Sequence, residues 1–282
     1  MNEDIVKEII KANATEVYKD STQPAVRVLG TSLAQCVSLF ATPIGRMALI
    51  FEKNIHKFLN KLDGMDDGQL VEPDTRIIVP ILEKLRYIED EKVSDYYTEI
   101  LAAASKKDQE KLVSLSYIEI LNRVTADELM ILEYINSEEN KIDISSLTQE
   151  DRDKYKLNEG PDFLSIKGVL PVVDVRLPIK KDAGYSGYTL LIKNFNVIDE
   201  KIKLNNYENI NSYLDNLISL GLLHKPFGES LAIKPIYNHL KNHKKVSLFE
   251  PVNGEKLDFN ESRIDVTDLC KNLLNLCQKN EN

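Results

Sequence analysis

The stretch Leu29–Leu62, LGTSLAQCVSLFATPIGRMALIFEKNIHKFLNKL, decides whether this chain is a membrane protein or a soluble helical one. The 18 residues between Arg27 and Arg46 carry no charge, but only ten of them are apolar. A membrane-spanning helix needs about 20 predominantly apolar residues. The apolar residues also recur at steps of three and four, the pattern of a one-sided helical seam. The stretch therefore predicts the core of a helical bundle, with peripheral membrane contact and membrane insertion as alternatives.

The second half of this stretch is a basic amphipathic helix. Its apolar residues fall on one side, and Arg46, Lys53, Lys57 and Lys61 fall almost opposite. This pattern is typical of helices that bind an anionic membrane surface, and equally of bundle helices with a solvated lysine face. We treat the four residues as a candidate membrane or partner surface. Because the lysines lie opposite the seam, we expect their replacement by glutamine to leave folding nearly unaffected.

The composition is that of a soluble globular protein. The chain has 282 residues, of which 43% are apolar and 29% charged. Its net charge of -9 argues against a protein built mainly to wrap nucleic acid. Three cysteines form no disulfide framework, and the N-terminus lacks the basic start and apolar block of a secretory signal. We therefore expect a cytoplasmic protein, with peripheral membrane association as the alternative.

The hydrophobic periodicity divides the chain into two parts. Helical spacing dominates to about residue 135, and Thr125 with Glu128 marks the start of one helix by a capping-box pattern. Pro80 should kink or end another helix. A polar stretch over 136–160 precedes β-branched runs, and a final amphipathic helix is expected from Ser262 to Gln278. We predict a mainly α fold, with an N-terminal helical bundle over 1–138 and a smaller α+β, winged-helix-like part over 160–282.

Two groups of residues resemble chemical sites. His239 and His243 are four residues apart on an expected helix, which could direct both imidazoles at one metal, but lysines surround them. Asp162 and Asp174 have a tolerable spacing for the magnesium-dependent nucleases of the PD-(D/E)xK type, but Arg176 stands where that pattern needs lysine. No serine or cysteine has a credible catalytic set. We therefore assign no catalytic, cofactor-binding or metal-binding residue and expect no cofactor.

The winged-helix-like segment raises the question of nucleic acid. Its central helix, YENINSYLDNLISL, contains Glu208 and Asp215 and no lysine or arginine. A helix that reads a DNA groove normally contacts phosphates through basic residues. Nucleic acid is therefore not the expected partner of this segment, and we favour a structural or protein-binding role.

Several helical segments resemble a known bacterial family. VPILEKLRYIEDEKVSDYYTEILAAAS, followed by LSYIEILNRVTADELMILEYI, is similar to segments of the abortive infection alpha family. The later YLDNLISLGLL and the opening Leu29–Leu62 stretch are similar to further segments, so that the resemblance covers roughly residues 25–240. These motifs are helix-packing patterns. The resemblance implies phage defence as the biological setting and supplies no catalytic residues.

Together these observations predict a non-enzymatic bacterial phage-defence protein that acts through contacts with a protein partner or a phage component. The basic helix is its candidate membrane-facing element. The alternative is a winged-helix regulator that binds nucleic acid, and a metal-dependent nuclease comes third. The residues do not indicate an oligomeric state.

Overall fold

The computed structural model describes residues 46–145, 147–158, 160–180, 186–249 and 256–278. The first half of the Leu29–Leu62 stretch, with Cys36, lies outside these residues. The chain divides into two compact units, Met1–Ala126 with Asn272–Asn282, and Asp127–Lys271. The division therefore falls before the polar stretch 136–160, whose described residues fold within the second unit.

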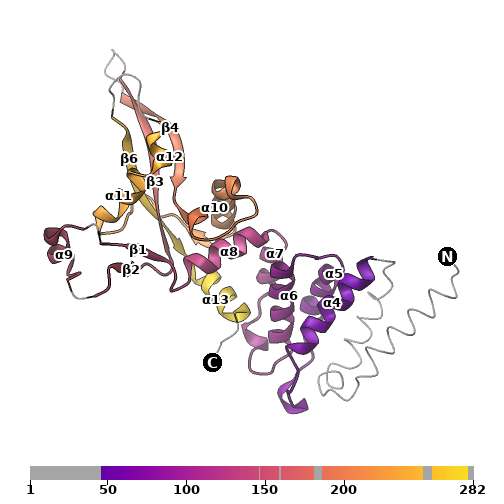
Figure 1. Ribbon diagram of the computed structural model, residues 1–282. Helices are drawn as coiled ribbons and strands as arrows, with labels where there is room; N and C mark the ends of the chain where they lie inside the picture. Colours follow the sequence, from indigo (N-terminus) through magenta and orange to yellow (C-terminus); the bar gives the residue numbers. More distant parts are fainter. Residues whose placement is uncertain (1–45, 146, 159, 181–185, 250–255, 279–282) are drawn as a thin grey trace. The chain divides into compact units, whose positions relative to one another are not determined.

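The first unit is a bundle of α-helices (Figure 1). The second half of the Leu29–Leu62 stretch forms α4, and its seam residues Phe51, Ile55, Phe58 and Leu62 are buried as predicted. None of the helices in the described part of the chain is long and apolar enough to cross a membrane. The elements of this unit are α4 (Arg46–Asn60), η1 (Asp67–Gln69), α5 (Thr75–Leu85), α6 (Glu91–Ala104), η2 (Glu110–Leu112), α7 (Leu115–Leu121) and the end of α13 (Asp268–Cys277).

Aspartates fix the starts of two of these helices. The Asp74 carboxylate accepts the N–H of Arg76 at the start of α5, and Asp90 accepts the N–H of Val93 at the start of α6. Such caps satisfy N–H groups that have no partner inside the helix. Pro80 lies inside α5, which continues to Leu85, so the helix does not end at the proline.

The second unit is built around a curled antiparallel sheet with the strand order β4-β3-β6-β5. A separate ribbon pairs β1 with β2. The elements of this unit are α8 (Ala126–Ile135), β1 (Lys141–Asp143), α9 (Gln149–Tyr155), β2 (Phe163–Ser165), β3 (Val169–Lys180), β4 (Ser186–Phe195), η3 (Ile198–Glu200), η4 (Tyr207–Asn209), α10 (Ile210–Ser219), β5 (Leu223–His224), η5 (Lys234–Tyr237), α11 (Asn238–Lys241), α12 (Lys244–Ser247), β6 (Asp258–Val266) and the start of α13.

Strand β3 is the centre of the sheet, and its two neighbours end at different points. The pairing of β3 with β6 ends at Arg176 opposite Asp258, whereas the pairing of β3 with β4 continues to Lys180 opposite Ser186. The last four residues of β3 and their partners in β4 therefore form a two-stranded hairpin beyond the rest of the sheet (Figure 1). Their partners are residues 186–189 of β4, and Leu190 lies opposite Arg176 at the base of the hairpin. We call the hairpin together with Leu190, residues 177–180 and 186–190, the arm.

Short helices cover one face of the sheet. Tyr237, Leu240 and Val246 of the segment from η5 to α12 are buried in one core cluster with Val173 and Val175 of β3. The Tyr237 hydroxyl also donates a hydrogen bond to the Ser262 carbonyl of β6 (3.0 Å). Apolar burial and a satisfied hydroxyl group thus fix the helices to the sheet.

A buried carboxylate holds the loop that precedes α10. Asp127 accepts hydrogen bonds from the backbone N–H groups of Asn205 and Asn206 (2.9 Å each) and from the Tyr213 hydroxyl (3.1 Å). Burial acts to raise the pKa of Asp127, but these donors outweigh it and the pKa lies below its ordinary value. Asp127 is therefore an anionic anchor for the loop.

The mainly α class is confirmed, but the C-terminal expectation was partly wrong. Residues from Ser262 to Val266 belong to β6 and not to a helix, and α13 begins only at Asp268. Ser262, Ile264 and Val266 are buried at alternate positions, the period of a strand. Between β5 and β6 the chain forms η5, α11 and α12, where a simple winged helix has a short loop. The winged-helix relationship stays a prediction.

Candidate functional site

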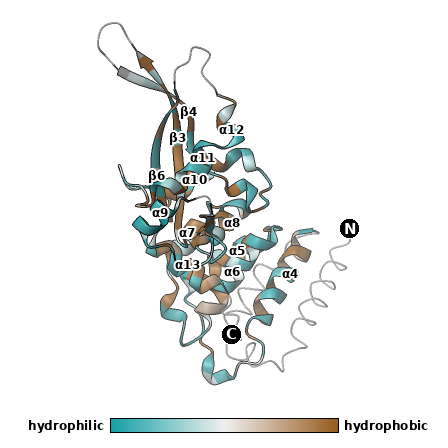
Figure 2. Ribbon diagram, turned by 60° about the vertical axis from the view of Figure 1, so that its left-hand side comes forward, coloured by the Kyte–Doolittle hydropathy of each residue, from teal (hydrophilic) through white to brown (hydrophobic). Residues whose placement is uncertain are grey.

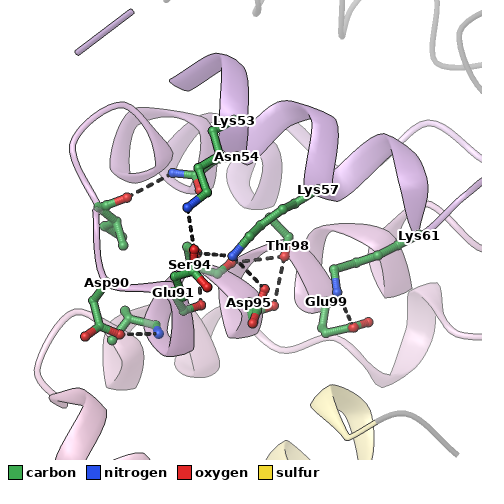
Figure 3. Close-up of polar contacts among 12 residues, drawn as sticks. Lys53, Asn54, Lys57, Lys61, Asp90, Glu91, Ser94, Asp95, Thr98 and Glu99 are labelled. Carbon is green, nitrogen blue, oxygen red and sulfur yellow. Dashed lines mark hydrogen bonds and ion pairs between the residues drawn. The ribbon is translucent and has the colours of Figure 1, made fainter. Parts of the chain in front are cut away.

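The three lysines of the candidate surface face acidic residues of α6 (Figure 3), and Arg46 pairs with Glu89 of the turn before α6. Three of the ion pairs join residues that are 38 positions apart. Because both members advance by one helical turn at a time, α4 and α6 run in the same direction with matched spacing. The pairs are Arg46–Glu89, Lys53–Glu91, Lys57–Asp95 and Lys61–Glu99. We call them the α4–α6 ladder.

The ladder is buried at one end and exposed at the other. The side chains of Lys61 and Lys57 are only 14% and 22% exposed, whereas Lys53 and Arg46 are 57% and 77% exposed. Lys57 also donates to the Ser94 hydroxyl (3.0 Å). The expectation that all the lysines occupy a solvated face was therefore wrong for Lys57 and Lys61. Interhelical packing covers them.

The buried Asn54 reinforces the same contact, and the seam pattern did not reveal it. Its side-chain amide donates to the carbonyl of Leu85 (2.8 Å), the last residue of α5, and to that of Ile88 (3.0 Å) in the turn after it. The Leu85 carbonyl lies where a helix runs out of internal N–H donors. Asn54 thus ties α4 to the end of α5 while the ladder ties α4 to α6.

Ion pairing changes what the basic face can do. Each of its four cations has a carboxylate partner within 4 Å, and the Lys53 side chain lowers the pKa of Glu91 through its hydrogen bond and its charge. An anionic membrane would have to compete with these carboxylates for Lys57 and Lys61. Only the end with Arg46 and Lys53 remains accessible. The use of this face for a membrane or a partner stays a prediction.

The two aspartates of the nuclease hypothesis have separate partners. Asp162 pairs with Arg152 (2.8 Å). Asp174 is almost buried on β3, where it accepts the backbone N–H of Asn194 (2.9 Å) and lies 3.6 Å from the Lys225 ammonium. In the described ranges, no group of three histidine, cysteine, aspartate or glutamate side chains could hold a metal ion. The local geometry therefore gives the nuclease hypothesis no support.

The two histidines of the possible metal pair also have protein partners. His243 Nδ1 accepts the N–H of Lys245 (3.2 Å), and its Nε2 donates to Glu200 (3.0 Å). His239 Nδ1 lies within hydrogen-bond distance of the Ile236 carbonyl. Both rings line the same cavity in the second unit. The structure thus brings these two residues together without directing them at a common metal.

The arm carries apolar side chains that the rest of the sheet does not cover. Ile179, Tyr188 and Leu190 are exposed, and hydrophobic residues are visible near the end of the hairpin in Figure 2. The Arg176 guanidinium lies 4.1 Å from the centre of the Tyr188 ring, a cation–π contact. Strand β4 is at the edge of the sheet, and its residues 186–192, SGYTLLI, carry no charge and no proline.

Sequence analysis did not single out the arm, because β-branched runs around a glycine-containing loop predict an ordinary hairpin. The signal that could have found it is the uncharged run 186–192, since edge strands usually carry lysine, proline or a bulge. The position of β4 at the sheet edge was not deducible from its residues.

The comparisons with known proteins identify the family. A family model described as abortive infection alpha matches residues 50–277. The chain belongs to the abortive infection alpha family. The match begins inside α4 and includes α6 and the arm, so that of the features described above only Arg46 at the start of α4 lies outside the matched residues. At the family level it is an abortive-infection-type defence protein. No curated protein and no solved structure shows significant similarity to the chain.

Proposed function

We propose that this abortive infection protein defends its bacterial host without catalysis, by pairing the exposed edge of β4 with an extended, apolar segment of a partner protein. The partner is a host protein or a phage component, and the encounter takes place in the cytoplasm. The observation that carries the proposal is the uncharged, uncovered edge strand with Tyr188 and Leu190 exposed on it.

The edge of β4 has the properties of a strand-pairing template. An edge strand presents a row of unpaired N–H and C=O groups, and proteins normally block it with charge, proline or a bulge. Residues 186–192 have neither charge nor proline, and the irregularity in their pairing with β3 lies at Leu191, between the pairs Val175–Ile192 and Arg176–Leu190 and so outside the arm. The first charged residue, Lys193, is engaged with Asp215 (2.7 Å). Strand addition would satisfy these backbone groups, and alternate side chains would supply the specificity.

The energetics of the arm point the same way. A two-stranded hairpin is marginally stable by itself in water. The arm adds exposed Ile179, Tyr188 and Leu190 to that marginal pairing. A partner strand would bury these side chains, at about 25 cal/mol for each Å² of apolar surface removed from water. Binding would therefore stabilise the arm as well as the complex.

We also propose that α10, β5 and β6 form a winged-helix-like unit used for protein contacts. The supporting observation is that α10, INSYLDNLIS, includes Asp215 and no basic residue. This composition disfavours the alternative of a DNA-reading regulator. Membrane contact through α4 is a further alternative, with Arg46 and Lys53 as its accessible cations.

A phage-challenge assay tests the proposal. Cells that express the wild-type chain, Tyr188→Lys/Leu190→Lys or Leu112→Lys would be compared for plaque formation at matched protein levels. Leu112 is a matched control because it is an exposed leucine of the first unit, far from the sheet in sequence. Far-ultraviolet circular dichroism would verify that each variant is folded.

We expect the double arm variant to lose protection, because charge on an edge strand blocks strand pairing. Leu112→Lys should protect like the wild type. Full protection by a folded double arm variant would refute the arm as the contact site. Protection lost equally in both variants would show a general sensitivity to surface charge and would also count against the proposal.

A further inference from the structure

The second unit contains a half-open cavity of about 250 Å³ that the proposed arm contact does not use. It lies among the end of α8, the β1 strand, the start of β3, the η3 turn and α11. Ligand pockets usually have roughly 300 to 1,000 Å³. At about 250 Å³ the cavity lies just below this range, so it can hold a small molecule but neither a peptide nor a nucleic-acid strand.

The floor of the cavity is apolar and belongs to the fold. Five almost fully buried side chains contribute to it, so the floor is fixed by core packing. An aliphatic floor would hold the apolar part of a ligand through the hydrophobic effect. The five residues are Ile142, Ile166, Leu170, Ile198 and Leu240.

The rim of the cavity carries both signs of charge. Lys201 contributes an ammonium group, and in the described part of the chain this group forms no ion pair within 4 Å. Asp143 and Glu200 contribute carboxylates. The Asp143 carboxylate accepts a hydrogen bond from the N–H of Ser145 (2.8 Å), and the Glu200 carboxylate accepts one from the His243 ring (3.0 Å). The Ser145 side chain also hydrogen-bonds Asp143, and the charge of Lys201 helps to lower the pKa of this carboxyl, so that the opposite charges of the rim lie near one another. A rim of this kind offers a place for an anionic and a cationic group together.

His239 lies at the same rim and reports on its electrostatics. Burial of the ring lowers the pKa of His239, and the charge of Lys201 lowers it further, whereas the contact with the Ile236 carbonyl acts to raise it. If Nδ1 carries the proton for the Ile236 carbonyl, then Nε2 is left as an acceptor for a ligand.

We propose that this cavity binds a small zwitterion with an apolar side chain, the chemical class of a free hydrophobic amino acid. The ligand carboxylate contacts Lys201, its ammonium contacts Glu200 and Asp143, and its side chain lies on the aliphatic floor. A simple anion would be repelled by the two carboxylates, and a simple cation would be repelled by the Lys201 ammonium. Only a ligand with both charges is complementary to the whole rim.

Nuclear magnetic resonance of the histidine rings in the full chain tests this proposal. L-Phenylalanine would be titrated against the protein, and the ring resonances of His239 and His243 would be followed. Three analogues each lack one part of the ligand: 3-phenylpropionate lacks the ammonium, phenethylamine lacks the carboxylate, and glycine lacks the side chain. The variants Lys201→Gln and Glu200→Gln remove one charge each, and Lys203→Gln is the control, two residues along and outside the cavity lining.

We expect saturable shifts of both histidines with L-phenylalanine at millimolar concentration and much weaker shifts with each analogue. Lys201→Gln and Glu200→Gln should each weaken binding about tenfold, the loss of one charge-assisted contact. Lys203→Gln should bind like the wild type. The absence of shifts with L-phenylalanine, equal binding of 3-phenylpropionate, or equal binding by Lys201→Gln would overturn the proposal. The arm plays no part in these outcomes.

Discussion

The buried end of the α4–α6 ladder should contribute strongly to the stability of the first unit, and Lys61→Gln tests this. The substitution keeps most of the aliphatic stem and a hydrogen-bonding head but removes the charge. It leaves the Glu99 carboxylate, only 15% exposed, without its partner. An uncompensated buried charge is the most destabilising result of breaking such a pair.

The magnitude follows from the burial of the pair. Removal of one partner from a fully buried pair costs 3–5 kcal/mol, whereas exposed pairs contribute roughly 0–1 kcal/mol. The Lys61–Glu99 pair is close to the buried limit, but Lys106 lines the same polar surface cavity and can approach Glu99. We therefore expect Lys61→Gln to lower the free energy of unfolding by about 2 kcal/mol.

Native-state hydrogen exchange read by mass spectrometry is the assay, because two units need not unfold together. A loss of about 2 kcal/mol corresponds to about thirtyfold faster exchange of the most protected amides of α4 and α6. The matched control is Lys53→Gln, which removes a lysine from the exposed Lys53–Glu91 pair of the same ladder. This control should leave the exchange rates unchanged. Lys61→Gln/Glu99→Gln should restore most of the protection, since it leaves no lone charge. Wild-type exchange in Lys61→Gln would refute the reasoning.

Four further outcomes are expected. Phe51→Ala should lower the stability of the first unit by about 3–5 kcal/mol in the same exchange assay, through a cavity in the α4 seam. The pKa of Asp127 is lower in the folded protein than in the unfolded chain, so its carboxylate stabilises the fold. This stabilisation is complete above about pH 4, the pKa in the unfolded chain, and is lost as the pH falls through the pKa in the folded protein. In urea unfolding at pH 7, Asp127→Asn should therefore have a lower free energy of unfolding than the wild type, and the difference between the two should be smaller in acid. Gly221→Ala should cost about 1 kcal/mol, because this residue has φ +73° at the end of α10. Arg46→Gln/Lys53→Gln should leave liposome flotation unchanged; Lys- and Arg-dependent flotation on anionic vesicles would favour the membrane alternative.

Features that depend on local pattern were predictable. The three-and-four spacing of the Leu29–Leu62 stretch predicted which face of α4 is buried. The glycine of YLDNLISLGLL likewise marks the end of α10: the N–H of Gly221 donates to the Ile218 carbonyl and that of Leu222 to the Leu217 carbonyl, as in a Schellman motif. In both cases the information lies within a few residues of the feature itself.

Features that depend on pairing between distant segments were not predictable. The basic face of α4 suggests solvent or membrane, because nothing in the helix shows that the acidic face of α6 meets it at matched spacing. The amphipathic run that follows Ser262–Val266 predicts a helix there, but these residues pair with β3 as a strand. For the same reason the sequence points to the basic face of α4 as the candidate site, whereas the structure points to the arm. The position of β4 at the sheet edge follows from strand order alone.

The placement of charge separates the two surfaces that could make contacts. On α4, Lys57 and Lys61 are held by carboxylates and largely buried, so a partner that recruited them would first have to break pairs that the bundle needs. On β4, the run 186–192 has no charge to displace, and its outer backbone groups have no strand beside them in the described sheet. Strand pairing there would add contacts without removing any. The free-energy balance therefore favours the arm, and it does so independently of which protein supplies the second strand.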